Sequence, residues 1–136
     1  MQFVLNNWYL FLGLAVVLFM LFADPIRQRL LGIATVPASQ AIQILNRQNG
    51  VIVDVREPNE FSTGHIPNAA NIPVGSIAGR LKELNKYKDK PVIVVCRSGQ
   101  RSAHAAVVLR KNGFASVYNL AGGMLTWQAD NLPTES

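Results

Sequence analysis

The chain opens with an uninterrupted apolar segment and then alternates between short apolar runs and amphipathic stretches. The first 23 residues contain no acidic or basic side chain, and residues 8–23 read WYLFLGLAVVLFMLFA. As a helix these residues cover roughly 24 Å, and residues 3–7 bring the segment near the ~30 Å hydrocarbon thickness of a bilayer. We therefore predict a transmembrane anchor over residues 1–24 and a juxtamembrane linker over residues 25–35.

The remaining residues, 36–134, carry the pattern of one α/β domain. Short β-rich runs predict strands over residues 35–36, 51–55, 70–72, 91–96 and 116–120, and the stretches between them predict helices over residues 38–46, 58–62, 77–84, 101–112 and 124–129. Continuous apolar strands separated by helices indicate a parallel sheet covered on both faces, which presents reactive groups at the carboxyl ends of its strands. Cys96 lies at such an end.

The basic residues that flank the apolar run predict how the anchor is oriented in the membrane. No basic residue precedes the apolar run, which favours a retained anchor over a cleaved signal peptide. Arg27 and Arg29 follow the run, and the positive-inside bias places that side in the cytoplasm. We therefore expect a single-pass protein of the inner (plasma) membrane, attached through residues 3–23, with the N-terminus outside and the domain in the cytoplasm.

The cysteine content and the net charge of the chain limit the compartments and binding partners that we expect. The chain has a single cysteine, so it has no internal disulfide and suits a reducing compartment. The formal charge of +5 favours anionic lipid surfaces and small anionic substrates. Nucleic acid is not expected as a partner, because the basic residues form no run and no aromatic residues are interleaved with them.

The run CRSGQRS, residues 96–102, carries the strongest chemical signal. It is expected to join a strand to a helix, with Gly99 permitting the sharp turn. The amide groups of such a loop and the N-terminus of the helix stabilise an anion at the loop centre. Arg97 and Arg101 add positive charge beside the sulfur, so the pKa of Cys96 should fall. The loop therefore predicts a reactive thiolate that needs no histidine base.

Three stretches resemble the rhodanese homology family over roughly residues 36–133. CRSGQRS is similar to the active loop of single-domain rhodaneses, DVREPNEFSTGHIPNAANIP to the first family signature, and AGGMLTWQADNLP to its C-terminal close. The resemblance implies a five-stranded parallel sheet flanked by helices. It also implies a sulfurtransferase of the thiosulfate:acceptor class, in which Cys96 cycles between thiol and persulfide without a cofactor or metal. The donor would be a small sulfur anion, and the acceptor an external thiol or cyanide.

The resemblance also suggests roles for individual residues. Cys96 is expected to be the nucleophile, and the expected substrate-binding positions are Arg97, Ser98, Gly99, Gln100, Arg101 and Ser102. Asp54 and Arg56 are expected to support the site, with a structural ion pair as the favoured interpretation. Three interpretations of Arg97 and Arg101 stay open: each contacts the substrate, is an ordinary solvated charge, or pairs with an acid such as Asp54 or Glu57.

Two other classes of function are alternatives. A cysteine-dependent phosphatase holds phosphate in a Cys-x5-Arg loop, but here one residue fewer separates Cys96 from Arg101, and the tighter ring suits sulfur better. The domain could also be a non-enzymatic module that binds a protein partner near the membrane. Sulfur transfer that disappears in Cys96→Ser separates the enzyme from both alternatives.

Overall fold

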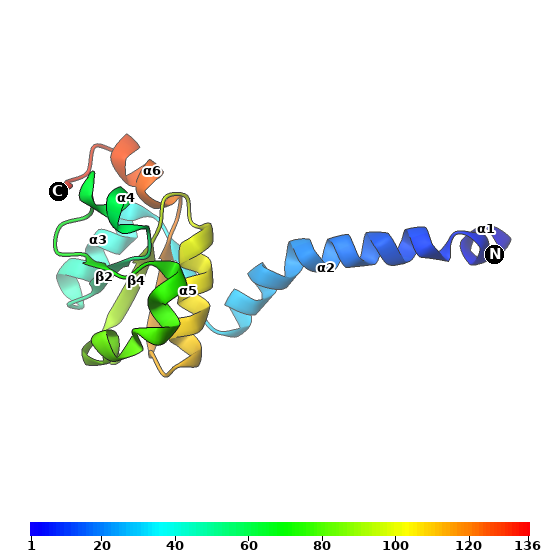
Figure 1. The fold of residues 1–136 in the computed structure, drawn as a ribbon, viewed down its shortest axis with the longest axis horizontal. Coiled ribbons are helices and arrows are strands. Elements are labelled where there is room, and N and C mark those ends of the chain that lie inside the picture. Colours follow the sequence, from blue (N-terminus) through cyan, green and yellow to red (C-terminus); the bar gives the residue numbers. More distant parts are fainter.

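The computed structural model describes the backbone of residues 1–136 and all side chains except those of Asp24, Pro25 and Gln28. A five-stranded sheet forms the centre of the domain (Figure 1). Its strands are β1 Ala34–Val36, β2 Val51–Asp54, β3 Ala70–Asn71, β4 Pro91–Val95 and β5 Ser116–Leu120, in the order β1-β5-β4-β2-β3. Every pairing is parallel, so the predicted parallel sheet is confirmed.

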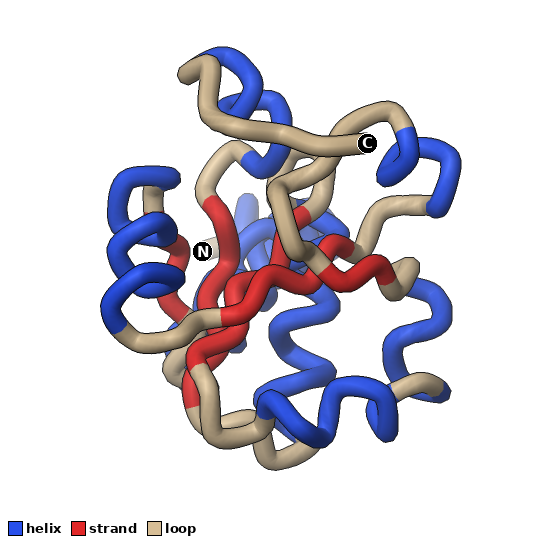
Figure 2. Tube along the Cα trace, turned by 90° about the vertical axis from the view of Figure 1, so that its left-hand side faces the viewer, coloured by secondary structure: helices blue, strands red, loops and turns tan.

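Helices cover both faces of the sheet, and Figure 2 shows the strands passing between them. One face carries α5 Gln100–Lys111 and the 3-10 helices η1 Val74–Gly79 and η2 Leu81–Tyr87, and the other carries α3 Ala38–Arg47 and α6 Gly123–Ala129. The alternation along β4 explains the two layers, because Val92 and Val94 pack on the α5 side and Ile93 and Val95 on the α3 side. This central strand is buried on both faces and ends at Cys96.

The prediction of one continuous helix over residues 77–84 is wrong. The structure has two 3-10 helices there, separated at Arg80, whose φ of −119° and ψ of 20° are not helical. Ile77 anchors the first of these helices in the core and Leu84 anchors the second. Each short turn therefore buries one apolar side chain, which is a common use of 3-10 structure in connecting segments.

An N-terminal arm, formed by α1 Gln2–Asn6 and α2 Trp8–Leu30, extends away from the domain (Figure 1). Helix α2 continues through Leu30, so the first part of the segment expected to be a linker is helical. The helix stops where Gly32 adopts a φ of +74°. Within the residues that the structure describes, no helix is both long enough and apolar enough to cross a bilayer. The predicted transmembrane anchor therefore has no support from the fold.

Candidate active site

Cys96 begins the loop that joins β4 to α5, at the carboxyl end of the central strand. Gly99 adopts a φ of +114°, a conformation that L side chains rarely take, and its N–H donates a hydrogen bond to Cys96 Sγ at 3.0 Å. Ser102 Oγ lies 3.3 Å from the same sulfur atom. Cys96 is only 1 % exposed, so the sulfur lies at the floor of the loop.

Opposing effects set the pKa of Cys96. Burial raises this pKa because the thiolate loses water. Hydrogen bonds from the Ser102 hydroxyl, and from the backbone amides of Ser102, Gly99 and Ser98, lower it and prevail, so the pKa lies below its ordinary value. A larger fraction of the cysteine is therefore thiolate at neutral pH, and the thiolate is the form that attacks sulfur.

Asn119 on β5 holds Ser102 and the loop together. Ser102 Oγ donates to Asn119 Oδ1 at 2.5 Å, and Asn119 Nδ2 donates to the carbonyl of Gly99 at 3.1 Å. A hydroxyl has one hydrogen, so it cannot serve both Asn119 and an ionised Cys96. In the structure this hydrogen is directed to Asn119, so a hydrogen bond from Ser102 to the thiolate requires the hydroxyl to turn from Asn119 Oδ1 toward Sγ.

Arg101 forms an ion pair with Glu60 of α4, the helix over Pro58–Ser62. The guanidinium is bidentate, with Nη1 2.7 Å from Oε1 and Nη2 3.0 Å from Oε2. The hydrogen bonds from Arg101 are the main cause that lowers the pKa of Glu60 to about 2, and the carboxylate in turn raises the pKa of Arg101. Of the open interpretations, the structure supports the ion pair for Arg101, with Glu60 rather than with Asp54 or Glu57 as the partner.

Asp54 and Arg56 form a buried ion pair where β2 ends. Arg56 Nη2 lies 2.7 Å from Asp54 Oδ2, and the same nitrogen donates to the carbonyl of Gly64 at 2.9 Å. Asn71 Nδ2 donates to the carbonyls of both residues. This network fixes the chain just before α4, which carries Glu60, so Asp54 and Arg56 act on the loop through the backbone that positions Glu60.

Arg97 is exposed and lines a pocket at the mouth of the loop. The pocket has a volume of about 350 Å³, and its other lining residues are Arg56, Asn59, Glu60, Thr63, Met124, Leu125 and Gln128. Among the described side chains, Arg97 forms no ion pair, so its guanidinium is available to an anionic group. Ser98 and Gln100 are exposed on the same loop.

Helix α6 supports the loop from the outside. Met124 N–H donates to the carbonyl of Cys96 at 2.9 Å, and Leu125 N–H donates to the carbonyl of Arg97 at 3.1 Å. Gly123 makes this approach possible, because a Cβ there would lie 2.7 Å from the Arg97 carbonyl oxygen and closer still to the Cys96 oxygen. Its φ of +55° disfavours other residues independently of the space.

Glu60, Asn119 and Gly123 were not predicted as site residues. Asn119 offers a sequence signal, because it is a polar residue near the carboxyl end of a strand of the predicted parallel sheet. Glu60 and Gly123 lie in the two outer stretches that resemble the family, but their roles depend on contacts with a loop more than 20 residues away in the chain.

The fold and the loop define a class of α/β domains in which a cysteine thiolate lies in a strand-loop-helix cradle. Residues 37–130 match the rhodanese-like domain, and the chain belongs to this family. It is 41% identical over 93 residues to the thiosulfate sulfurtransferase GlpE of Pseudomonas syringae pv. syringae (strain B728a), covering 68% of this chain and 85% of that protein. These findings support sulfurtransferase activity.

Two further relatives place the chain within the family. It is 38% identical over 102 residues to the uncharacterized protein YibN of Escherichia coli (strain K12), covering 74% of this chain and 71% of that protein. The crystal structure of a rhodanese-related protein from Thermoplasma volcanium superposes with a TM-score of 0.67 and 30% identity, covering 75% of this chain and 97% of the other. The similarity therefore extends over most of the domain.

Proposed function

We propose that the chain transfers sulfane sulfur through a persulfide on Cys96, from a small anionic donor such as thiosulfate to an external thiol or cyanide. The observation that carries the proposal is the hydrogen bonding at Cys96 Sγ, which lies 3.0 Å from the Gly99 amide and 3.3 Å from the Ser102 hydroxyl. These donors favour the Cys96 thiolate, which is the nucleophile when the persulfide forms and the leaving group when the sulfur is passed on.

The proposed reaction has two displacement steps. The Cys96 thiolate attacks the outer sulfur of thiosulfate, the S–S bond of the donor breaks, and its electron pair leaves with sulfite. The acceptor then attacks the terminal sulfur of the persulfide, and the Cys96 thiolate leaves with the electron pair of the broken bond. Cyanide becomes thiocyanate, a thiolate becomes a persulfide, and no oxidant or reductant is consumed.

The surroundings of Cys96 support a small donor. Because the residue is only 1 % exposed, a donor must present a slim terminal sulfur atom rather than a sulfur flanked by bulky groups. The exposed guanidinium of Arg97 beside the pocket can attract the oxyanion end of such a donor. The ion pair between Arg101 and Glu60 leaves less positive charge for a phosphate dianion, which counts against the phosphatase alternative.

An intact-mass measurement tests the persulfide directly. The full chain in a neutral detergent should gain about 32 Da, one sulfur atom, on incubation with thiosulfate and should lose it on addition of cyanide. Cys96→Ser should show no gain because it lacks the thiol nucleophile. A folded protein with a free thiol that gains no mass from thiosulfate or from an organic persulfide would refute the proposal and favour the non-enzymatic alternative.

We also propose that residues 3–23 attach the chain to the inner (plasma) membrane, with the domain cytoplasmic and the N-terminus outside. The large apolar side chains of residues 3–22 are 44–73% exposed, and such a surface is unfavourable in water. Arg27 and Arg29 lie on the domain side of the run, as expected for a cytoplasmic side. The sulfur acceptor would then be a thiol near the bilayer, on a small molecule or a protein partner.

A reporter fused after Ser136 tests this topology. A reporter active only in the cytoplasm is the expected result. Activity outside the cytoplasm would refute the orientation, and recovery of the full chain in the aqueous fraction of an alkaline membrane wash would refute the attachment.

A further inference from the structure

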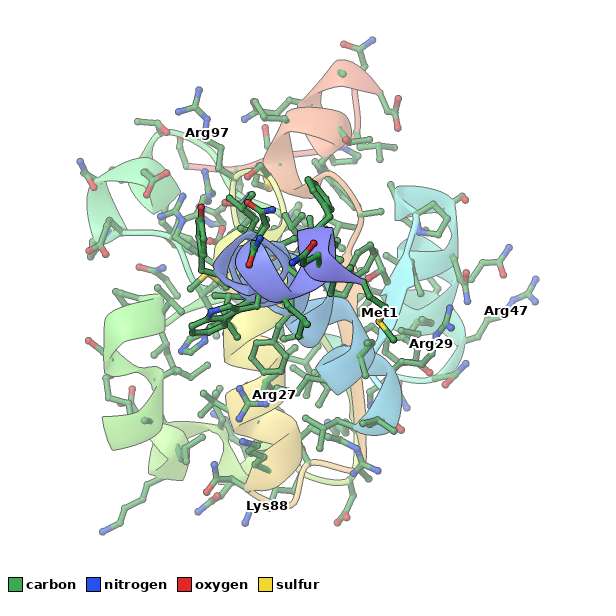
Figure 3. All side chains as sticks on the ribbon, turned by 90° about the vertical axis from the view of Figure 1, so that its right-hand side faces the viewer. Met1, Arg27, Arg29, Arg47, Lys88 and Arg97 are labelled. Atoms are coloured by element: carbon green, nitrogen blue, oxygen red, sulfur yellow. The ribbon has the colours of Figure 1, made fainter. Side chains whose placement is uncertain are left out.

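We propose that a basic pocket between α2 and α5 binds the head group of an anionic phospholipid, an inference that rests on the membrane attachment proposed above. The pocket has a volume of about 180 Å³ and is lined by Arg27 from α2 and by Gln100, His104, Val107, Val108 and Lys111 from α5, among others. Figure 3 looks along the arm toward the domain and shows Arg27 in front of α5. The pocket shares Gln100 with the Cys96 loop, but it has no lining residue in common with the pocket that contains Arg97.

The charges of the pocket match a phosphodiester. Arg27 and Lys111 are cationic, Gln100 adds an amide donor, and no acidic residue lines the pocket among the described side chains. A guanidinium donates two parallel hydrogen bonds to phosphate oxygens, and an ammonium adds a compact positive charge. Val107 and Val108 supply apolar contacts of the kind that the glycerol carbons of a lipid can use.

The junction between the arm and the domain holds the pocket in shape. Arg110 Nε donates to the carbonyl of Leu31 at 2.8 Å, and Arg110 Nη1 donates to the carbonyl of Phe114 at 2.9 Å. Leu31 packs against the core and Ile33 is part of it. The end of α2 is therefore held against α5, and Arg27 and Lys111 line the same cavity.

The pocket also lies at the right depth for a head group. Arg27 follows the last apolar residue of the run, Ala23, by four positions, which is ~6 Å along a helix axis. The polar region on each side of the hydrocarbon core is roughly 5–7 Å thick. If Ala23 ends in the hydrocarbon region, Arg27 lies among the phosphates. The lipid is therefore the favoured source of the phosphate group.

Native mass spectrometry of the full chain tests the pocket. The chain in neutral detergent is offered equal amounts of phosphatidylglycerol and phosphatidylcholine with the same acyl chains. We expect one phosphatidylglycerol to bind about tenfold more than phosphatidylcholine, since each basic residue at a membrane surface favours anionic lipid. The double variant Arg27→Gln with Lys111→Gln should lose this preference, whereas the charge-matched control Lys86→Gln with Lys88→Gln should keep it. All variants should still gain sulfur from thiosulfate, which confirms that they are folded.

The proposal that the pocket binds a lipid head group would be refuted by equal binding of the two lipids or by a preference that survives in the Arg27 and Lys111 double variant. It would also be refuted if inorganic phosphate displaced phosphatidylglycerol. The last result would identify a site for free anions instead of lipid. Flotation with vesicles of pure phosphatidylcholine separates this proposal from membrane attachment. If the chain floats but shows no head-group preference, only the lipid-binding pocket is refuted. If the chain does not float, the membrane attachment and the lipid-binding pocket are both refuted.

Discussion

Removing the Ser102 hydroxyl tests how the loop activates Cys96. Ser102→Ala deletes the donor that lies 3.3 Å from Sγ and leaves the Gly99 amide, at 3.0 Å, in place. The hydroxyl is the largest of the effects that lower the pKa of Cys96, so the variant should have a higher cysteine pKa than the wild type. Persulfide formation from thiosulfate should therefore slow at neutral pH.

The expected decrease in the rate of persulfide formation can be worked out from the contacts of the Ser102 hydroxyl. A hydrogen bond to a charged group contributes ~1.5–3 kcal/mol, but here the hydroxyl must first leave Asn119 Oδ1, so the lower value applies. About 1.4 kcal/mol corresponds to about tenfold less thiolate. The remaining thiolate is more basic and, with a Brønsted slope of about 0.4–0.5, roughly threefold more nucleophilic. The net loss in rate should therefore be about threefold.

The assay is the rate of persulfide formation by quenched intact mass, from about pH 5 to about pH 10. The ratio of wild-type to variant rate should fall toward one, or below it, as pH rises, because both cysteines then become fully ionised. Ser76→Ala, at an exposed serine of η1, is the matched control and should follow the wild type. A ratio that stays constant over the whole range would refute the reasoning, because it would mean that Ser102 only positions the sulfur.

Two further predictions concern the supports of the loop. Glu60→Gln should lower the free energy of unfolding at neutral pH by about 1–2 kcal/mol, a value reduced for partial solvent screening of the ion pair. Because the folded pKa of Glu60 is about 2 and the ordinary value is 4.5, this difference from the wild type should be complete above pH 4.5 and vanish as pH falls toward 2. Gly123→Ala should cost about 2–4 kcal/mol and slow sulfur transfer, because its Cβ would collide with the carbonyls of Cys96 and Arg97.

Urea unfolding checks both variants. Gly75→Ala is the control for the glycine, since a Cβ there meets no atom within 4 Å, and it should change stability little. A Gly123→Ala protein of wild-type stability would contradict the assigned contact with the Cys96 loop. For Glu60→Gln, a stability difference that persists at about pH 2 would show that the ion pair with Arg101 is not its cause.

Much of the fold could be predicted because it depends on local periodicity. The strands Val51–Asp54 and Pro91–Val95 are apolar runs between helical stretches, apart from Asp54 at the end of the first. Such runs become central parallel strands where both of their faces are buried. The segment after Pro73 was harder, because single apolar anchors such as Ile77 and Leu84 fit an α-helix and a 3-10 helix equally well. Only packing against the sheet selects between the two.

The candidate site likewise has features that could be predicted from local sequence and features that could not. The sequence by itself determined the loop from Cys96 to Ser102, because a strand, a glycine turn and a helix that follow one another along the chain dictate where the amides point. Only the tertiary structure decided that Arg101 pairs with Glu60, that Asn119 bonds Ser102, and that Gly123 touches the loop. These contacts join elements that are distant in sequence. They exist because the sheet order brings β5, α4 and α6 to the edge where β4 ends, and no local pattern encodes that order.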